Sequence, residues 1–176
     1  LRQDQHAVER RAELVRHVLE KMGAIVTWQN MRKEVGEIVG DVNVKSQPLS
    51  GLDLQGDIIP SIIDEIPIIA LLATQADSPT SVRNAEELRH KESDRIDAIC
   101  HNIKKMGIDI IEMKDGFIIN PENKLKNADI KTFGDHRIAM VFSIAELLTS
   151  DKNSFDDLSC IDISFPNFFE ILKQIK

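Results

Sequence analysis

Two similar six-residue segments occur in this chain, and their similarity limits the possible folds more than any other feature. Lys-Met-Gly-Ala-Ile-Val at 21–26 is echoed by Lys-Met-Gly-Ile-Asp-Ile at 105–110. At both places a helical spacing of apolar residues stops at a glycine, and a strand-like run follows. Asp64 and Asp135 likewise stand before two strongly apolar segments. We therefore predict an internal repeat of about 70 to 85 residues, each copy combining two helices with a small sheet.

Apolar periodicity predicts the individual elements. The helices at 68–76 and 137–148 are apolar on almost every side, so they must be buried centrally. The predicted fold class is α/β, in which sheets and amphipathic helices wrap these buried helices. The other expected helices cover 9–22, 95–106 and 167–175, and the expected strands cover 24–28, part of 35–45, 80–82, 108–112, 117–119, 129–131 and 160–163, with a hairpin turn at Asp115-Gly116.

The composition excludes several classes of protein. A length of 176 residues suits one domain with a proper core. The net charge of −7 argues against a nucleic-acid partner, which would need a basic stripe. No apolar run reaches membrane-spanning length and no leader opens the chain, so we expect a cytoplasmic protein without a membrane partner. Cys100 and Cys160 lack metal-site spacing, so we expect two buried, reduced thiols and no metal. The first residue is Leu, which suggests a piece of a longer protein.

A run of seven polar residues, Arg-His-Lys-Glu-Ser-Asp-Arg at 89–95, stands directly before the amphipathic helix expected at 95–106. Helix N-termini are electropositive, so cations are disfavoured there and an anion is favoured. The gathered cations, with two acids among them, therefore indicate an anionic ligand and acid/base chemistry. A solvated helix start laced with salt bridges is the alternative.

Arg137 poses the same problem at the start of a helix that must be largely buried. Its guanidinium needs a partner, which is either Asp135 or an incoming carboxylate or phosphate. Arg95 stands in the same relation to its own helix, and a guanidinium can bind a planar carboxylate with two hydrogen bonds. Asp64 and Asp135 can also serve simply as N-caps of the helices that follow them.

The repeat would bring these helix starts to one face of the molecule. Anion binding beside paired carboxylates suits proton transfer to and from a substrate that carries phosphate or carboxylate. For His136 we favour a structural hydrogen bond over a proton shuttle or a metal ligand. The candidate site residues are Asp64, Lys91, Glu92, Arg95 and Arg137.

Four motifs resemble, in order and spacing, the C-terminal half of the 5-enolpyruvylshikimate-3-phosphate synthase family. They are the polar run with Ile at 89–96, Asp-Glu-Ile-Pro at 64–67, Gly-Asp-His-Arg-Ile-Ala-Met at 134–140 and Ser-Phe-Pro at 164–166. The resemblance implies an inside-out α/β barrel domain built from repeated βαβαββ units, one of two similar domains. Residues 1–176 would form the C-terminal domain, and the N-terminal domain would be absent from this chain.

The resemblance also implies a reaction. The family transfers the enolpyruvyl group of phosphoenolpyruvate to the 5-hydroxyl of shikimate 3-phosphate and releases phosphate, a step of aromatic amino-acid biosynthesis. It uses no metal or organic cofactor. By resemblance, Asp64 would accept the hydroxyl proton and bind the shikimate ring, and Glu92 would handle the proton at the methylene. Lys91 would contact the shikimate ring and the reacting centre, while Arg95 and Arg137 would clamp phosphoenolpyruvate.

Two positions depart from the family pattern. Ile163 stands where some members have Lys, and Glu87 stands where some have Asn. Because the N-terminal half of the cleft would be missing, we expect a folded monomer that supplies the phosphoenolpyruvate side and turns over little or nothing alone. One alternative is a relative of UDP-N-acetylglucosamine enolpyruvyl transferase, which would lack the Lys-Glu-Ser-Asp-Arg run. Another is a non-catalytic domain that binds an anion or docks a partner protein.

Overall fold

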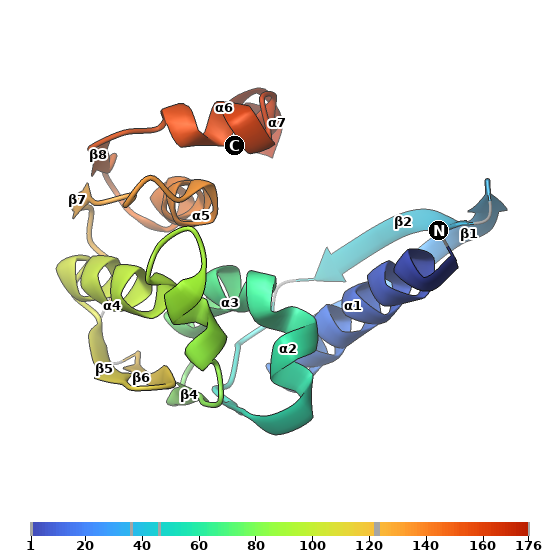
Figure 1. Cartoon of the computed structure of the whole chain (residues 1–176), viewed down its shortest axis with the longest axis horizontal. Coiled ribbons are helices and arrows are strands. Elements are labelled where there is room, and N and C mark those ends of the chain that lie inside the picture. Colours follow the sequence, from blue (N-terminus) through green and yellow to red (C-terminus); the bar gives the residue numbers. More distant parts are fainter. Residues whose placement is uncertain (1, 36, 46, 122–123, 176) are drawn as a thin grey trace.

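The computed structural model describes residues 2–35, 37–45, 47–121 and 124–175. A complete βαβαββ unit occupies the middle of the chain (Figure 1). Its sheet has the strand order β3-β4-β6-β5, in which β3 and β4 are parallel and the other neighbours are antiparallel. The main elements of this unit are β3 (Asp53–Leu54), α3 (Ile66–Ala73), β4 (Thr80–Val82), α4 (Arg95–Lys105), β5 (Asp109–Met113) and β6 (Gly116–Asn120). Short turns of helix precede α3 and α4, namely η1 (Gly56–Ile58), α2 (Ile59–Ile62), η2 (Ile63–Glu65) and η3 (Glu86–His90).

Partial units flank the complete one. Before it, α1 (Arg2–Lys21) leads into an antiparallel hairpin of β1 (Ile25–Glu34) and β2 (Glu37–Lys45), and Figure 1 shows these three elements as an arm that extends from the rest. After it, β7 and β8 pair in parallel on either side of α5 in the sequence. The elements of this last part are β7 (Asp129–Ile130), α5 (His136–Ala145), η4 (Glu146–Leu148), β8 (Ser154–Phe155), α6 (Ser159–Ser164) and α7 (Phe168–Ile175).

The two glycine joints have the same geometry, which confirms the repeated helix-to-strand connection. Gly23 and Gly107 adopt φ angles of +101° and +88°, a left-handed conformation that favours glycine after a helix. In each joint the residue after the glycine donates its backbone N–H to a carbonyl five residues earlier, from Ala24 to Leu19 and from Ile108 to Ile103. Thus α1-β1-β2 and α4-β5-β6 are corresponding segments of two units.

The core confirms the prediction of buried central helices in an α/β fold. Helix α3 packs against both α4 and α5, and α4 also contacts α5. Ile66 and Ala73 at the two ends of α3 are fully buried, as are Ile138 and Ala145 of α5. Helix α4 is amphipathic and buries the apolar face predicted for it. No described helix is long and apolar enough to cross a membrane.

The strand predicted at 160–163 is wrong, because these residues belong to helix α6. Apolar residues alternate with polar ones here, but four residues are too few to separate a strand from a helical turn. Only Ile161 is fully buried, against Ala139 and neighbours on α7, whereas Ile163 is 88% exposed. The backbone N–H of Phe165 donates to the Ile161 carbonyl and closes the turn.

Other boundaries differ less. The two-residue strands β3 and β8 were not predicted, because so short a strand has no periodic pattern. Strand β1 continues to Glu34 instead of ending at residue 28. Helix α3 begins at Ile66 and ends at Ala73, and α5 ends at Ala145 before a 3₁₀ turn, each slightly offset from the predicted 68–76 and 137–148.

Candidate active site

Arg95 is the centre of the candidate site. As the first residue of α4 it is only 1% exposed. Its Nε donates to Asp135 Oδ2 at 2.8 Å, its Nη1 to Asp64 Oδ1 at 3.2 Å, and its Nη2 to Glu92 Oε2 at 2.5 Å. One guanidinium therefore holds three carboxylates that come from the starts of three different helices. The structure brings together Asp64, Glu92 and Arg95, as the repeat predicts.

Asp135 combines a capping function with a buried ion pair. It is the N-cap of α5, where its Oδ1 accepts the backbone N–H groups of Arg137 and Ile138 at 2.9 and 3.4 Å. Its Oδ2 accepts from Arg95 and from the Ser93 hydroxyl, the latter at 3.1 Å. Burial raises the pKa of this carboxyl, but the Arg95 guanidinium and the other hydrogen bonds outweigh burial, so the pKa lies below its ordinary value. Asp135 is therefore an ionised anchor.

Asp64 is not an N-cap, contrary to the simpler interpretation of its position. It lies in η2, and the residue in the cap position of α3 is Glu65. Its carboxylate lies between two guanidinium groups, 3.2 Å from Arg95 Nη1 and 3.7 Å from Arg137 Nη2. Its side chain is 25% exposed, so the carboxylate remains within reach of a ligand.

The Arg137 guanidinium contacts both the carboxylate and the backbone carbonyl oxygen of Asp64. Its Nη1 also donates to the Asp64 carbonyl oxygen at 3.2 Å. The ion partner of Arg137 is therefore Asp64, while Asp135 binds only its backbone N–H. With 32% of its side chain exposed, Arg137 can still meet an anion from solvent.

Both interpretations of the 89–95 run apply to part of it: some of its residues form surface salt bridges, and others belong to the candidate site. Arg89 is a salt-bridged surface residue, bound to Asp94 and Glu112 at 2.8 and 2.9 Å and to backbone carbonyls of the β5–β6 hairpin. Lys91 Nζ lies 2.5 Å from Glu87 Oε1. Arg95 alone of the three turns into the core. Glu87 was not predicted as the lysine partner, although its spacing of four residues from Lys91 is a signal that could have identified it.

A pocket of about 240 Å³ lies beside Asp64 and Arg137. The pocket has space for a small ligand, and its lining is mostly apolar apart from Asp64, Glu65 and Arg137. Its other lining residues are Glu65, Ile68, Met140, Val141, Ile144, Phe165 and Phe168.

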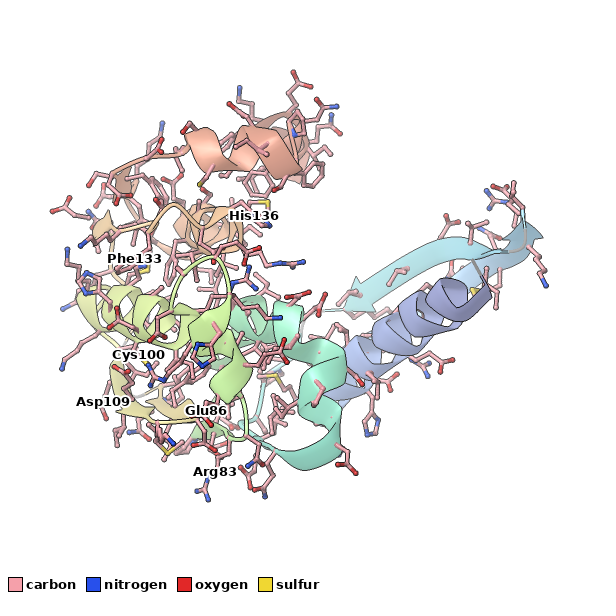
Figure 2. The ribbon with its side chains drawn as sticks, in the orientation of Figure 1. Arg83, Glu86, Cys100, Asp109, Phe133 and His136 are labelled. Carbon is pink, nitrogen blue, oxygen red and sulfur yellow. The ribbon has the colours of Figure 1, made fainter. Side chains whose placement is uncertain are left out.

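Within the part of the chain that the structure describes, His136 and the two cysteines belong to no cluster of metal-ligating side chains. Figure 2 shows His136 at the start of α5, and the structural hydrogen bond expected for its side chain is not found among the described residues. The described residues contain no group of three or more metal-ligating side chains. Cys100 is buried on α4, and burial raises the pKa of its thiol to about 12 (Figure 2). Cys160 is only half-buried, so the expectation of two buried thiols holds for Cys100 alone.

Comparisons with known proteins identify the family. The family described as EPSP synthase (3-phosphoshikimate 1-carboxyvinyltransferase) matches residues 4–172. A 3-phosphoshikimate 1-carboxyvinyltransferase from Oceanobacillus iheyensis is 48% identical over 167 residues, which are 95% of this chain and 39% of that protein. The enzyme of the same name from Petrotoga mobilis is 46% identical over 90% of this chain and 37% of its own length. This chain thus spans about two fifths of the length of these relatives.

Solved structures agree with the sequence relatives. EPSP synthase from Acinetobacter baumannii superposes with a TM-score of 0.85 at 37% identity, over 92% of this chain and 38% of that one. The enolpyruvyl transferase NikO from Streptomyces tendae superposes with a TM-score of 0.70 at 19% identity, over 97% of this chain and 36% of its own, which shows the shared fold alone. The chain has the α/β fold of one domain of an enolpyruvyl transferase, and it belongs to the EPSP synthase (3-phosphoshikimate 1-carboxyvinyltransferase) family.

Proposed function

We propose that this chain is the C-terminal domain of a two-domain enzyme that transfers the enolpyruvyl group of phosphoenolpyruvate to the 5-hydroxyl of shikimate 3-phosphate. It supplies the phosphoenolpyruvate side of the cleft. The observation that carries this proposal is the pair of carboxylates, Asp64 and Glu92, held by the single guanidinium of Arg95 beside the partly exposed Arg137. We further propose that the whole enzyme is monomeric and cytoplasmic and uses no metal or organic cofactor.

The reaction needs two proton transfers that flank one anion, and Asp64 and Glu92 are suited to them. Asp64 accepts the proton of the 5-hydroxyl as the hydroxyl oxygen bonds to C2 of phosphoenolpyruvate. Glu92, once it has taken up a proton from solvent through its exposed side, delivers that proton to the methylene carbon. The C2–O bond to phosphate then breaks, and a methyl proton returns to Glu92. The proton held by Asp64 leaves with the phosphate. Glu92 is 51% exposed, so its carboxyl can reach a ligand in the cleft.

The basic residues differ in their solvent exposure and in the number of hydrogen-bond donors that they leave for the substrate. Arg137 is the guanidinium that solvent reaches, so we assign it the main contact to phosphoenolpyruvate. We assign Arg95 a smaller part in the phosphoenolpyruvate clamp, because its side chain is only 1% exposed and three of its five N–H donors are used on carboxylates. The Lys91 ammonium has three donors, and one of them faces Glu87, so the others can bind the shikimate ring.

The charge on this face supports the need for a second domain. The ion-paired groups of this face are three cations and four carboxylates, so together they carry a net charge of −1 when every group is ionised. Two strongly anionic substrates would not bind such a surface without cations from elsewhere. The groups counted are Lys91, Arg95, Arg137, Asp64, Glu87, Glu92 and Asp135.

Phosphate release tests the proposal directly. In a chimera, this chain replaces the matching region of the Oceanobacillus iheyensis relative, so that the rest of that protein supplies the second domain. We expect the chimera to release phosphate from phosphoenolpyruvate plus shikimate 3-phosphate, and the 176 residues alone to release little or none. Full activity of the isolated chain would contradict the division of the site between two domains, and an inactive, folded chimera would contradict the function itself.

The other two functions considered are less well supported. The relatives from Oceanobacillus iheyensis and Petrotoga mobilis are both named 3-phosphoshikimate 1-carboxyvinyltransferase, which does not favour a UDP-N-acetylglucosamine enolpyruvyl transferase. A non-catalytic anion-binding domain would tolerate the loss of Asp64 or Glu92 in the chimera, whereas the proposed enzyme would not.

A further inference from the structure

We infer that Glu87 is a positioning residue that holds the Lys91 ammonium at the edge of the candidate site. This inference rests on the proposed function. Glu87 Oε1 lies 2.5 Å from Lys91 Nζ, and the lysine side chain is only 23% exposed. Glu87 itself is 59% exposed, so its carboxylate is open to solvent beside the half-buried ammonium.

The segment that carries both side chains is firmly anchored. Between them in sequence, Leu88 is fully buried in the core. Arg89 binds Asp94 and Glu112, and its Nε and Nη2 donate to the carbonyls of Lys114 and Met113 at 2.7 and 2.6 Å. Most exposed ion pairs are weak because two mobile side chains must be ordered. Here the backbone between the two residues is already fixed, so only the two side chains must be ordered.

Each neighbouring carboxylate is engaged with a different cation. Glu92 binds Arg95, and Asp94 binds Arg89 and caps α4. Within the described residues, Glu87 is the ion-pair partner of Lys91. A lysine is a point charge on a flexible four-carbon stem, so its position depends on such a partner more than that of a guanidinium does. Glu87 therefore determines where this ammonium meets a ligand.

Removal of the Glu87 charge should have two opposite effects. The face loses one negative charge, so an anionic substrate should bind more tightly. The ammonium also loses its anchor, so fewer bound substrates are correctly aligned when the chemical step occurs. A residue with a merely structural role would lower stability and would not produce this split between KM and kcat.

The test compares Glu87→Gln with Glu86→Gln in the chimera. Glu86 has the same charge one residue away, but it pairs with Lys114 at 3.3 Å in a bridge whose lysine is 86% exposed. For Glu87→Gln we expect kcat to fall about tenfold and the KM for shikimate 3-phosphate to fall about threefold. For Glu86→Gln we expect both constants to stay within about twofold of the parent, because an exposed pair contributes little.

A double-mutant cycle shows whether Glu87 acts through Lys91. In a Lys91→Met background, Glu87→Gln should leave kcat unchanged, because the group that it positions is gone. The inference is overturned if the two changes are additive, if Glu87→Gln behaves like Glu86→Gln, or if it lowers the thermal midpoint while kcat and KM stay at parent values. A folded but inactive parent chimera would overturn the proposed function, whereas an active parent that gives any of these three results would overturn the inference alone, so the two failures are distinguishable.

Discussion

Two arginines open two adjacent helices of this domain, and the structure uses them differently. Arg95 at the start of α4 is 1% exposed and binds three carboxylates. Arg137 near the start of α5 is 32% exposed, and its ion-pair partner among the described residues is Asp64, at 3.7 Å. Both stand at the positive end of a helix dipole, where a cation is unfavourable. In each case the carboxylate partners compensate for this unfavourable position of the guanidinium.

The difference separates two functions that the sequence motif does not distinguish. Arg95 is enclosed with its partners, so its main effect is to hold Asp64, Glu92 and Asp135 in fixed positions. Arg137 shares only one of those carboxylates and has surface left for a ligand. Breaking a buried charge network costs about 3–5 kcal/mol, whereas breaking an exposed pair costs about 0–1 kcal/mol.

Arg95→Met should have the largest effect, because it leaves three carboxylates without their shared counter-ion. We expect the free energy of unfolding of the chimera to fall by about 3–5 kcal/mol and activity to be lost. Urea unfolding followed by circular dichroism measures the first quantity. The matched variant Arg137→Met should cost less than about 1 kcal/mol. Equal losses from the two variants would show that the contrast between the arginines is wrong.

Asp64→Asn should have the next largest effect, because this carboxylate is common to both arginines and carries a proposed proton transfer. We expect kcat for phosphate release to fall at least about a hundredfold, with a smaller loss of unfolding free energy than for Arg95→Met, because Arg95 keeps Glu92 and Asp135. Asp97→Asn, an exposed acid in the first turn of α4, is the matched control and should keep nearly full activity. A kcat for Asp64→Asn close to that of the control would eliminate Asp64 as the proton acceptor.

Arg137→Lys should show a smaller effect that is confined to ligand binding. Lysine retains the charge but cannot reproduce the forked donors of a guanidinium, so the KM for phosphoenolpyruvate should rise about tenfold. Steady-state kinetics at saturating shikimate 3-phosphate measures this. If the KM for shikimate 3-phosphate rises instead, Arg137 belongs to the other side of the cleft.

Much of this arrangement could be predicted from the sequence. The spacing of apolar residues identified the buried helices, and the repeat placed the starts of α3, α4 and α5 on one face. The different burial of Arg95 and Arg137 could not be predicted. It depends on Asp64 and Asp135, which lie 31 and 40 residues from Arg95 in the chain. Local sequence carries no information about which of these distant carboxylates encloses which guanidinium.

Strands β2 and β6, which occupy corresponding places in the two units, differ in burial in a way that could not be predicted from the sequence either. Val42 and Val44 were predicted correctly as strand residues, but they are 51% and 58% exposed. Phe117 and Ile119 hold the matching register positions in β6 and are fully buried. Strand β6 has β4 and β5 as neighbours and α4 beside it, whereas β2 pairs with β1 alone. Alternation therefore predicts the strand, and the neighbouring elements decide its burial.

Ser93→Ala should have the smallest effect, and its pH dependence sharpens the contrast between the two helix starts. The Ser93 hydroxyl donates to Asp135, and its loss at neutral pH should cost about 1 kcal/mol of unfolding free energy. Asp135 has a pKa in the folded state below its ordinary value of 3.8, so its stabilising contribution is complete above that pH. The contribution disappears as the pH falls through the folded-state pKa. The difference between variant and parent should therefore shrink below pH 3.8, as urea unfolding at several pH values would show.

The matched control is Ser150→Ala, which removes a hydroxyl that bonds the exposed Asp151, so it should change stability little at any pH. A Ser93→Ala cost that persists undiminished in acid would mean that the hydroxyl stabilises the loop and not the ionised Asp135 anchor.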